Sequence, residues 1–306
     1  MLALLFAATL AAQEPIPGIG PKGPATKVAG GFGFIEGPAA DGQGNLYFSD
    51  IPNARIHKLD AHGKVTVFRE KSNKSNGLMV DGRGRILACE MDGAVVALSA
   101  DGQGREVLAD QHNGKPLNAP NDLVIDKTGG IYFTDPMYGA KTPLPQGKTC
   151  VYYLPKGGKP ARLLDNLPNP NGVILSPDEK TLYVIPSSQR QMMAYPVEAP
   201  GKLGVGRVFC ELAQRRPGGN SGGDGLAVDV QGNLYITAET GVQVWSPAGK
   251  LLGTLVFPEQ PANCDFGGPG NKTLYATART GLYQVELEIP ATGSPAHDAP
   301  GYLFSR

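Results

Sequence analysis

The sequence of 306 residues lacks the features that mark several common protein classes. Lys plus Arg and Asp plus Glu number 28 each, so there is no net charge and no basic stripe that would bind nucleic acid. It contains no evident Ser/His/Asp set, which disfavours a serine nucleophile. The Gly-rich stretch 218–225 lacks the Lys-Ser/Thr of a phosphate loop. No amphipathic stretch is long enough to predict a helix.

Cysteine is scarce, and its spacing excludes a zinc knuckle because no Cys-x-x-Cys pair occurs. The four cysteines are Cys89, Cys150, Cys210 and Cys264. Export would permit disulfides, but no pairing can be deduced from the spacing. We interpret the four as single buried apolar residues in separate parts of the fold. The histidines His57, His62, His112 and His297 show no metal-ligand spacing.

The apolar run at residues 1–12, MLALLFAATLAA, is too short to span a bilayer. It has the apolar core and the small-residue end of a secretory signal, although it lacks the expected Lys or Arg near its start. We expect cleavage near Ala11 or Ala12, giving a periplasmic or secreted protein with no membrane span. An ordinary apolar arm is the alternative. Residues 13–26 then form a Pro/Gly-rich leader.

A turn followed by an alternating strand recurs six times along the chain. The third copy is DKTGGIYFTD at Asp126–Asp135. The copies begin at residues 41, 81, 126, 176, 229 and 268, so their spacings are 40, 45, 50, 53 and 39. This is the period of a four-stranded propeller blade. Gly and Asn in the turns accept the positive φ of tight hairpins, and the aromatic or β-branched runs suit strands.

The repeat predicts an all-β fold, a six-bladed β-propeller formed by residues 27–306 as a single domain. The 42 Gly and 27 Pro residues are therefore turn chemistry and not a sign of disorder. Two apolar segments could close the ring of blades. One is the N-terminal strand near Val28 and the other is the tail Tyr302–Phe304, and the sequence does not choose between them.

Ahead of the innermost strand of each blade stands an amide or a carboxylate. The six residues are Glu36, Asn76, Asn121, Asn171, Asp224 and Asn263. In three blades the residue precedes the start of the repeat by 5 positions, as Asn121 precedes Asp126. Any one of these residues could be an ordinary turn former. Their shared offset favours a ring of oxygen ligands around a hard cation in a central channel.

Several segments in the same order resemble one known family. They are Glu36–Pro38, Leu117–Leu123, Tyr132–Gly139, Pro170–Gly172, Leu175–Asp178, Gly223–Gly225 and Asn263–Gly268. The chain is similar over about residues 30–286 to the senescence marker protein/gluconolactonase/luciferin-regenerating-enzyme family, and most of all to its bacterial gluconolactonases. The resemblance implies a six-bladed propeller with a divalent metal in the channel, most often Ca²⁺, with Zn²⁺, Mg²⁺ or Mn²⁺ as alternatives. It also implies a small-molecule lactone substrate.

Carried over by position, the resemblance makes Glu36, Asn171 and Asp224 metal ligands. Asn121 would touch the metal or the substrate, and with Asp224 it forms the implied catalytic set. Asn76 and Asn263 are the remaining expected substrate-binding residues, while Asp122 is expected to hold its loop. Some animal members carry an arginine two residues before the asparagine that matches Asn121. This chain has Ala119 there, which leaves animal-type aldonolactone specificity open.

The expected chemistry is metal-dependent lactone hydrolysis. A divalent cation with open positions can polarise a carbonyl and activate water, and Asp224 can take the proton. Two other functions stay open at this point. One is a non-catalytic, calcium-stabilised propeller that binds a small ligand or a protein. The other is a different esterase activity at the same site, since a fold does not fix a reaction.

Overall fold

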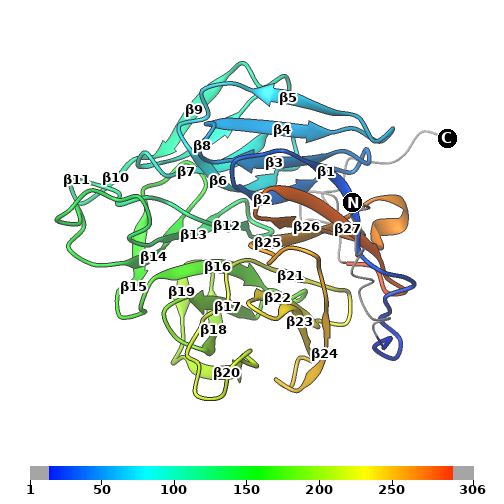
Figure 1. The fold of residues 1–306 in the computed structure, drawn as a ribbon. Coiled ribbons are helices and arrows are strands. Elements are labelled where there is room, and N and C mark those ends of the chain that lie inside the picture. Colours follow the sequence, from blue (N-terminus) through cyan, green and yellow to red (C-terminus); the bar gives the residue numbers. More distant parts are fainter. Residues whose placement is uncertain (1–13, 292–306) are drawn as a thin grey trace, which may run out of the picture.

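The protein is seen in a computed structural model that describes residues 14–291. Its strands form six antiparallel sheets of at least four strands, which follow one another around a centre in chain order (Figure 1). This confirms the predicted six-bladed β-propeller. The apolar run 1–12 and the tail Tyr302–Phe304 lie outside the described residues. Within the described range, no helix is long and apolar enough to cross a membrane.

Each blade runs from an innermost strand outward. The first blade comprises β2 (Ile35–Ala40), β3 (Leu46–Asp50), β4 (Arg55–Leu59) and β5 (Val65–Arg69). The second comprises β6 (Ser75–Val80), β7 (Ile86–Glu90), β8 (Ala94–Leu98) and β9 (Arg105–Ala109). The third comprises β12 (Leu123–Ile125), β13 (Ile131–Asp135), β14 (Cys150–Leu154) and β15 (Ala161–Leu164).

The fourth blade is the largest. It comprises β16 (Pro170–Leu175), β17 (Thr181–Pro186), β18 (Gln191–Ala199), β19 (Lys202–Leu203) and β20 (Arg207–Glu211). The fifth comprises β21 (Leu226–Val228), β22 (Leu234–Ala238), β23 (Gly241–Trp245) and β24 (Leu251–Leu255). The sixth comprises β25 (Asn263–Gly267), β26 (Thr273–Ala278), β27 (Gly281–Glu286) and β1 (Thr26–Gly30), with a 3₁₀ turn η1 (Pro269–Asn271) after β25.

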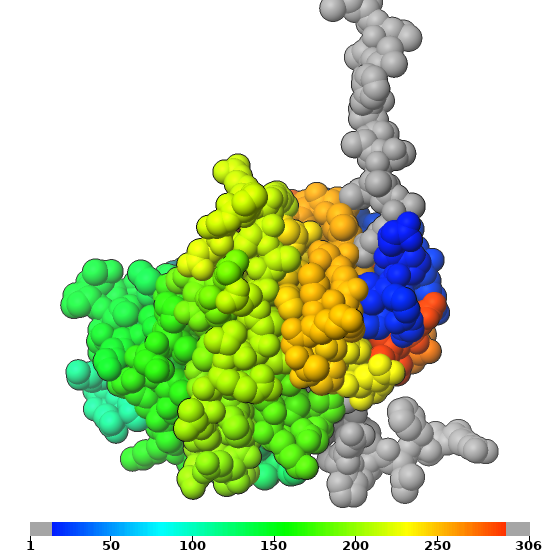
Figure 2. Space-filling model, turned by 90° about the horizontal axis from the view of Figure 1, so that it is seen from below, coloured from blue at the N-terminus to red at the C-terminus, as the bar shows by residue number. Residues whose placement is uncertain are grey.

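The N-terminal strand closes the ring. β1 pairs antiparallel with β27, with Thr26 opposite Gln284 and Gly30 opposite Gly281, and so supplies the outer strand of the sixth blade. Figure 2 shows the blue N-terminal segment lying against the orange and red residues near the other end of the chain. Of the two closing segments that the sequence left open, the structure uses the strand near Val28.

The repeated turn is held by its own aspartate. Asp41 Oδ1 accepts hydrogen bonds from the backbone N–H groups of Gln43 and Asn45, at 2.8 and 2.9 Å. Asp81, Asp126 and Asp229 accept the equivalent pairs of bonds in their own blades. This inner turn joins the first two strands of a blade. It therefore lies at the end of each innermost strand opposite to Glu36 and its counterparts.

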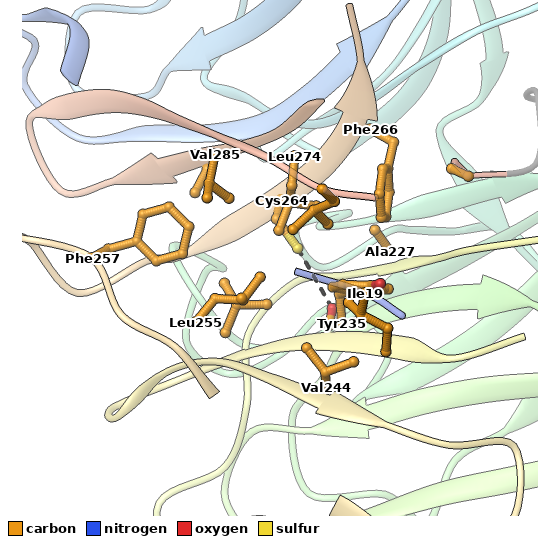
Figure 3. Packing of buried hydrophobic residues seen from close by; sticks show 14 of the residues in the cluster. Ile19, Ala227, Tyr235, Val244, Leu255, Phe257, Cys264, Phe266, Leu274 and Val285 are labelled. Atoms are coloured by element: carbon orange, nitrogen blue, oxygen red, sulfur yellow. Dashed lines mark hydrogen bonds between the residues drawn. The ribbon is translucent and has the colours of Figure 1, made fainter. Parts of the chain in front are cut away.

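The hydrophobic core is divided among the six interfaces between neighbouring blades. At the interface of the fifth and sixth blades, Tyr235 packs edge-on against Phe266, with ring centroids 4.9 Å apart (Figure 3). Ile16 and Ile19 of the leader are buried in the same cluster. The leader is therefore a part of this interface, beyond its predicted role as an approach to the first blade.

Two features depart from the simple repeat. A hairpin of β10 (Gln111–His112) and β11 (Lys115–Pro116) is inserted before the third blade, and β18 is extended to 9 residues so that it pairs with both β19 and β20. The cysteines follow the expectation. All four are buried, unpaired thiols within the described part of the chain.

Candidate active site

The six predicted site residues stand at one level of the central channel. Glu36, Asn76, Asn171 and Asn263 lie at the beginning of β2, β6, β16 and β25, while Asn121 and Asp224 precede β12 and β21 by two residues. These innermost strands contact one another in a closed ring. The side chains therefore come together as the shared sequence offset predicts. Their roles in binding or catalysis remain predictions.

Glycine lets the innermost strands approach closely at this level. Four of the six residues are followed by glycine, namely by Gly37, Gly77, Gly172 and Gly225. A Cβ at Gly225 would overlap the side-chain amide of Asn263 in the next blade, and one at Gly172 would meet the carbonyl oxygen of Asp224 at 2.5 Å. Because these glycines have no side chains, there is room for backbone hydrogen bonds between blades, such as the one from Gly172 N–H to Asp224 O at 2.9 Å.

Two carboxylates belong to this ring, and Asp224 acts electrostatically on Glu36. Glu36 is 4% exposed, and burial raises its pKa well above the ordinary value, with the nearby Asp224 carboxylate as the next cause. Burial likewise raises the pKa of Asp224 to about 6, while Asn171 and Arg279 act in the opposite direction. The channel thus gathers acidic side chains, and Arg279 is a positive side chain that acts on one of them.

The amides of the ring have defined partners. Asn171 Nδ2 donates to Asp224 Oδ1 at 2.5 Å, which leaves the amide oxygen as the end that could bind a cation. Asn263 is hydrogen-bonded to Glu36, and its Oδ1 accepts the N–H of Cys264 at 2.8 Å. The Asn76 amide has a weaker contact, 3.9 Å from Nδ2 to Met91 Sδ.

Asn121 is positioned through its backbone. Its N–H donates to Thr134 O at 2.9 Å, and its carbonyl accepts the Gly77 N–H at 2.7 Å. The loop ahead of it is held by Asp135, whose two oxygens accept the N–H groups of Asn118 and Ala119 at 2.9 and 2.8 Å. Asn121 is 5% exposed, so its side chain is buried in the channel wall.

Asp122 and Asp265 extend the acidic character below the ring. Asp122 accepts the N–H of Leu123 at 2.9 Å and that of Val173 in the next blade at 3.4 Å, which agrees with its expected loop-holding part. Asp265 bonds similarly to Ala40 N–H, at 3.0 Å. Burial raises the pKa of both carboxyl groups to about 7. Asp265 was not singled out from the sequence as a channel residue, although its position two residues after Asn263 could have indicated it.

Two further side chains at the channel mouth were missed by sequence reasoning. Tyr138, 38% exposed, lies in the loop after β13, hydrogen-bonds to Ser187 and Ser188, and is close enough to Asp224 for that carboxylate to help raise its phenol pKa. Arg279 follows β26 and acts electrostatically on Asp224. Neither residue shares the offset of the ring, so the repeat contained no signal for them.

A cavity of about 700 Å³ occupies the other half of the channel. Its walls are mainly apolar residues of the innermost strands, together with Asp122, Asn263 and Asp265. Glu36, Asn171 and Asp224 are not among its lining residues, so this cavity lies beyond the ring, toward the inner turns. The ring therefore separates this cavity from the mouth that Tyr138 and Arg279 border.

The donor set fits a hard divalent cation. Among residues 14–291, no three His, Cys, Asp or Glu side chains are grouped as a metal site, so any cation would rely on amides as well as carboxylates. Glu36 would supply a buried carboxylate and Asp224 a half-buried one, and Asn171 and Asn121 would supply amide oxygens. Oxygen ligands of this kind suit Ca²⁺, Mg²⁺ or Mn²⁺ better than soft metals. A bound cation would also favour the ionised form of both carboxyl groups and so oppose the burial that raises their pKa values.

Fold and site together define a six-bladed propeller with an acidic, amide-lined channel. A family model described as "SMP-30/Gluconolactonase/LRE-like region" matches residues 34–280, and the chain belongs to this family. It is 31% identical over 293 residues to a gluconolactonase of Zymomonas mobilis, covering 87% of this chain and 82% of that protein.

Solved structures agree with this assignment. A gluconolactonase from Xanthomonas campestris superposes with a TM-score of 0.78 at 32% identity, covering 86% of this chain and 89% of that one. A regucalcin from Agrobacterium tumefaciens, described as a calcium-binding protein, has a TM-score of 0.76 at 21% identity, covering 89% of this chain and 97% of that one. The latter likeness concerns the fold alone.

Proposed function

We propose that this protein is a hydrolase of sugar lactones that uses a divalent cation, most simply Ca²⁺, in its channel. The observation that carries the proposal is the pair of carboxylates, the buried Glu36 and the half-buried Asp224, which interact electrostatically among amides at one end of the channel. The gluconolactonases at 31% and 32% identity support the lactone substrate.

Glu36, Asn171 and Asp224 would hold the cation, with Asn121 beside it. When bound, the cation would polarise the lactone carbonyl and lower the pKa of nearby water. Asp224 would serve as the base, because its carboxylate lies in the same ring as the other proposed ligands and could take a proton from water beside the cation. Asn171 orients that carboxylate through its 2.5 Å hydrogen bond.

The reaction balances with these groups alone. The water oxygen bonds to the carbonyl carbon while Asp224 takes a proton from it, and the ring C–O bond then breaks. The departing alkoxide receives that proton from Asp224, and the product is a hydroxy acid. Asn76, Asn121 and Asn263, all 7% exposed or less, would contact the substrate oxygens from the channel wall.

The test is metal analysis of the purified protein, followed by a lactone panel before and after metal is stripped and restored. We expect hydrolysis above the spontaneous rate that disappears on stripping and returns with Ca²⁺. Asp224→Asn should lower kcat by at least about a hundredfold, in the range of general base removal. Asp101→Asn, an exposed turn residue, is the matched control. Chelator-insensitive turnover would remove the cation from the mechanism, and a folded protein inert toward every lactone would favour a non-catalytic binder.

A further inference from the structure

Arg279 lies beside the proposed cation site although it is distant from Glu36 in the chain. It follows β26 in the sixth blade, with its backbone in the left-handed region at φ 53°. Its carbonyl accepts the N–H of Ile35 at 2.9 Å, which fixes the residue against the strand that carries Glu36. Arg279 is therefore held at the junction of the sixth and first blades, at the same end of the channel as Glu36.

The guanidinium group is supported but not neutralised. Its Cζ lies over the ring of Phe34, 5.6 Å from the ring centre, and its Nη2 donates a hydrogen bond to Gln260 Oε1 at 2.9 Å. The residue is exposed, and no ion pair within residues 14–291 involves it. A guanidinium has five N–H donors in a rigid fork, so most remain available to a ligand that enters from solvent.

The negative charge of the site explains why a positive side chain beside it matters. Lactone hydrolysis releases a carboxylate next to Glu36 and Asp224, with Asp122 nearby, and like charges at this distance repel. Arg279 is the positive side chain whose field reaches Asp224.

We propose that Arg279 is a substrate-binding residue at the channel mouth, which holds lactone oxygens and pairs with the carboxylate of the hydroxy acid product. This inference rests on the proposed lactonase function. Its contact would be made by a charged side chain that follows β26, and so differs from the amide contacts that Asn76, Asn121 and Asn263 would provide. It predicts that the positive charge acts on binding of substrate and product, with little effect on the chemical step.

The experiment compares wild type, Arg279→Gln and Arg279→Lys, each loaded with Ca²⁺. Gluconate, the hydroxy acid from gluconolactone, is titrated calorimetrically and is also tested as an inhibitor. We expect Arg279→Gln to weaken gluconate binding and to raise KM by at least about tenfold, the range for a charge-assisted hydrogen bond. The kcat should change by less than about threefold, Ca²⁺ affinity should not fall because the lost positive charge acts on Asp224, and Arg279→Lys should recover part of the loss.

The matched control is Arg83→Gln, which removes the same charge from an exposed inner turn at the opposite end of the channel. Unchanged gluconate binding and KM in a folded Arg279→Gln protein would overturn the proposal, as would an equal loss in Arg83→Gln. The two proposals fail in different ways. A wild type that hydrolyses lactones while Arg279→Gln behaves identically overturns only this one, whereas a wild type that neither hydrolyses lactones nor binds gluconate overturns both.

Discussion

In protein stripped of divalent cations, the free energy of unfolding should fall as the pH rises from about 4 to about 7. Burial raises the pKa of Asp224 from 3.8 to about 6 and those of Asp122 and Asp265 from 3.8 to about 7. An unfolded chain ionises these groups near pH 4, while the folded chain retains their protons to higher pH. Because the folded state binds more protons across this window, its stability declines as they are released.

The magnitude follows from the shifts. For Asp224 alone, a change from 3.8 to about 6 is about two units, which corresponds to about 3 kcal/mol lost across the window. Two other groups change the free energy of unfolding in the opposite direction, each over a limited pH range. The pKa of Glu259 is lowered to about 2, so its contribution changes only below about pH 4.5. Burial lowers the pKa of His57, so the contribution of this one group to the free energy of unfolding rises with pH up to about pH 6.5. It opposes the fall that the three aspartates cause.

The assay is urea unfolding followed by the fluorescence of Trp245, from pH 4.5 to 7.5, with metal removed on a chelating resin. Asp224→Asn should flatten the slope by removing one of its sources, and Asp101→Asn should leave it unchanged. Adding Ca²⁺ at pH 7 should restore stability by mass action. Stability that is level or rises with pH in the stripped protein would refute the reasoning, as would an unchanged slope in Asp224→Asn.

Three further predictions concern the scaffold. Gly225→Ala should lower stability by about 1–3 kcal/mol and reduce lactone hydrolysis, because the new methyl group overlaps Asn263; melting curves against Gly23→Ala, which has open space, test this. Asp135→Ala should lower activity more than a surface change does, because it frees two N–H groups of the loop ahead of Asn121, and kinetics with melting curves would show it. Deleting residues 1–30 should lower the melting temperature and cause aggregation on gel filtration, because it exposes the edge of β27.

The blades were predictable because each one repeats the same local chemistry. An aspartate such as Asp41 caps the inner turn through its own side chain, so a short stretch of sequence determines that hairpin. Closure was not predictable in this way, since the strand near Val28 and the tail 302–304 are both apolar. Pairing of β1 with β27 is a contact between the ends of the chain, which no local pattern encodes.

The ring of site residues was predictable for the same reason, because its members share a place relative to a repeated strand. Asp265, Tyr138 and Arg279 were not found. The position of Tyr138 depends on Ser187 and Ser188 of another blade, and that of Arg279 on Phe34 and Gln260. Contacts of this kind arise only when the blades are assembled, so one sequence without its fold does not reveal them.

Backbone contacts, more than side chains, set the spacing of this site. Gly77 N–H bonds to Asn121 O at 2.7 Å and Gly172 N–H to Asp224 O at 2.9 Å, so neighbouring innermost strands are joined where the proposed ligands stand. Side-chain changes at Asp224 should therefore alter charge and cation binding while the ring keeps its shape. Substitutions of the glycines should instead distort the ring and leave the charge of the ligands unchanged, because a methyl group forces the strands apart. If Gly172→Ala and Asp224→Asn gave the same combination of lost stability and lost Ca²⁺ affinity, the frame and the ligands would not be separable in this way.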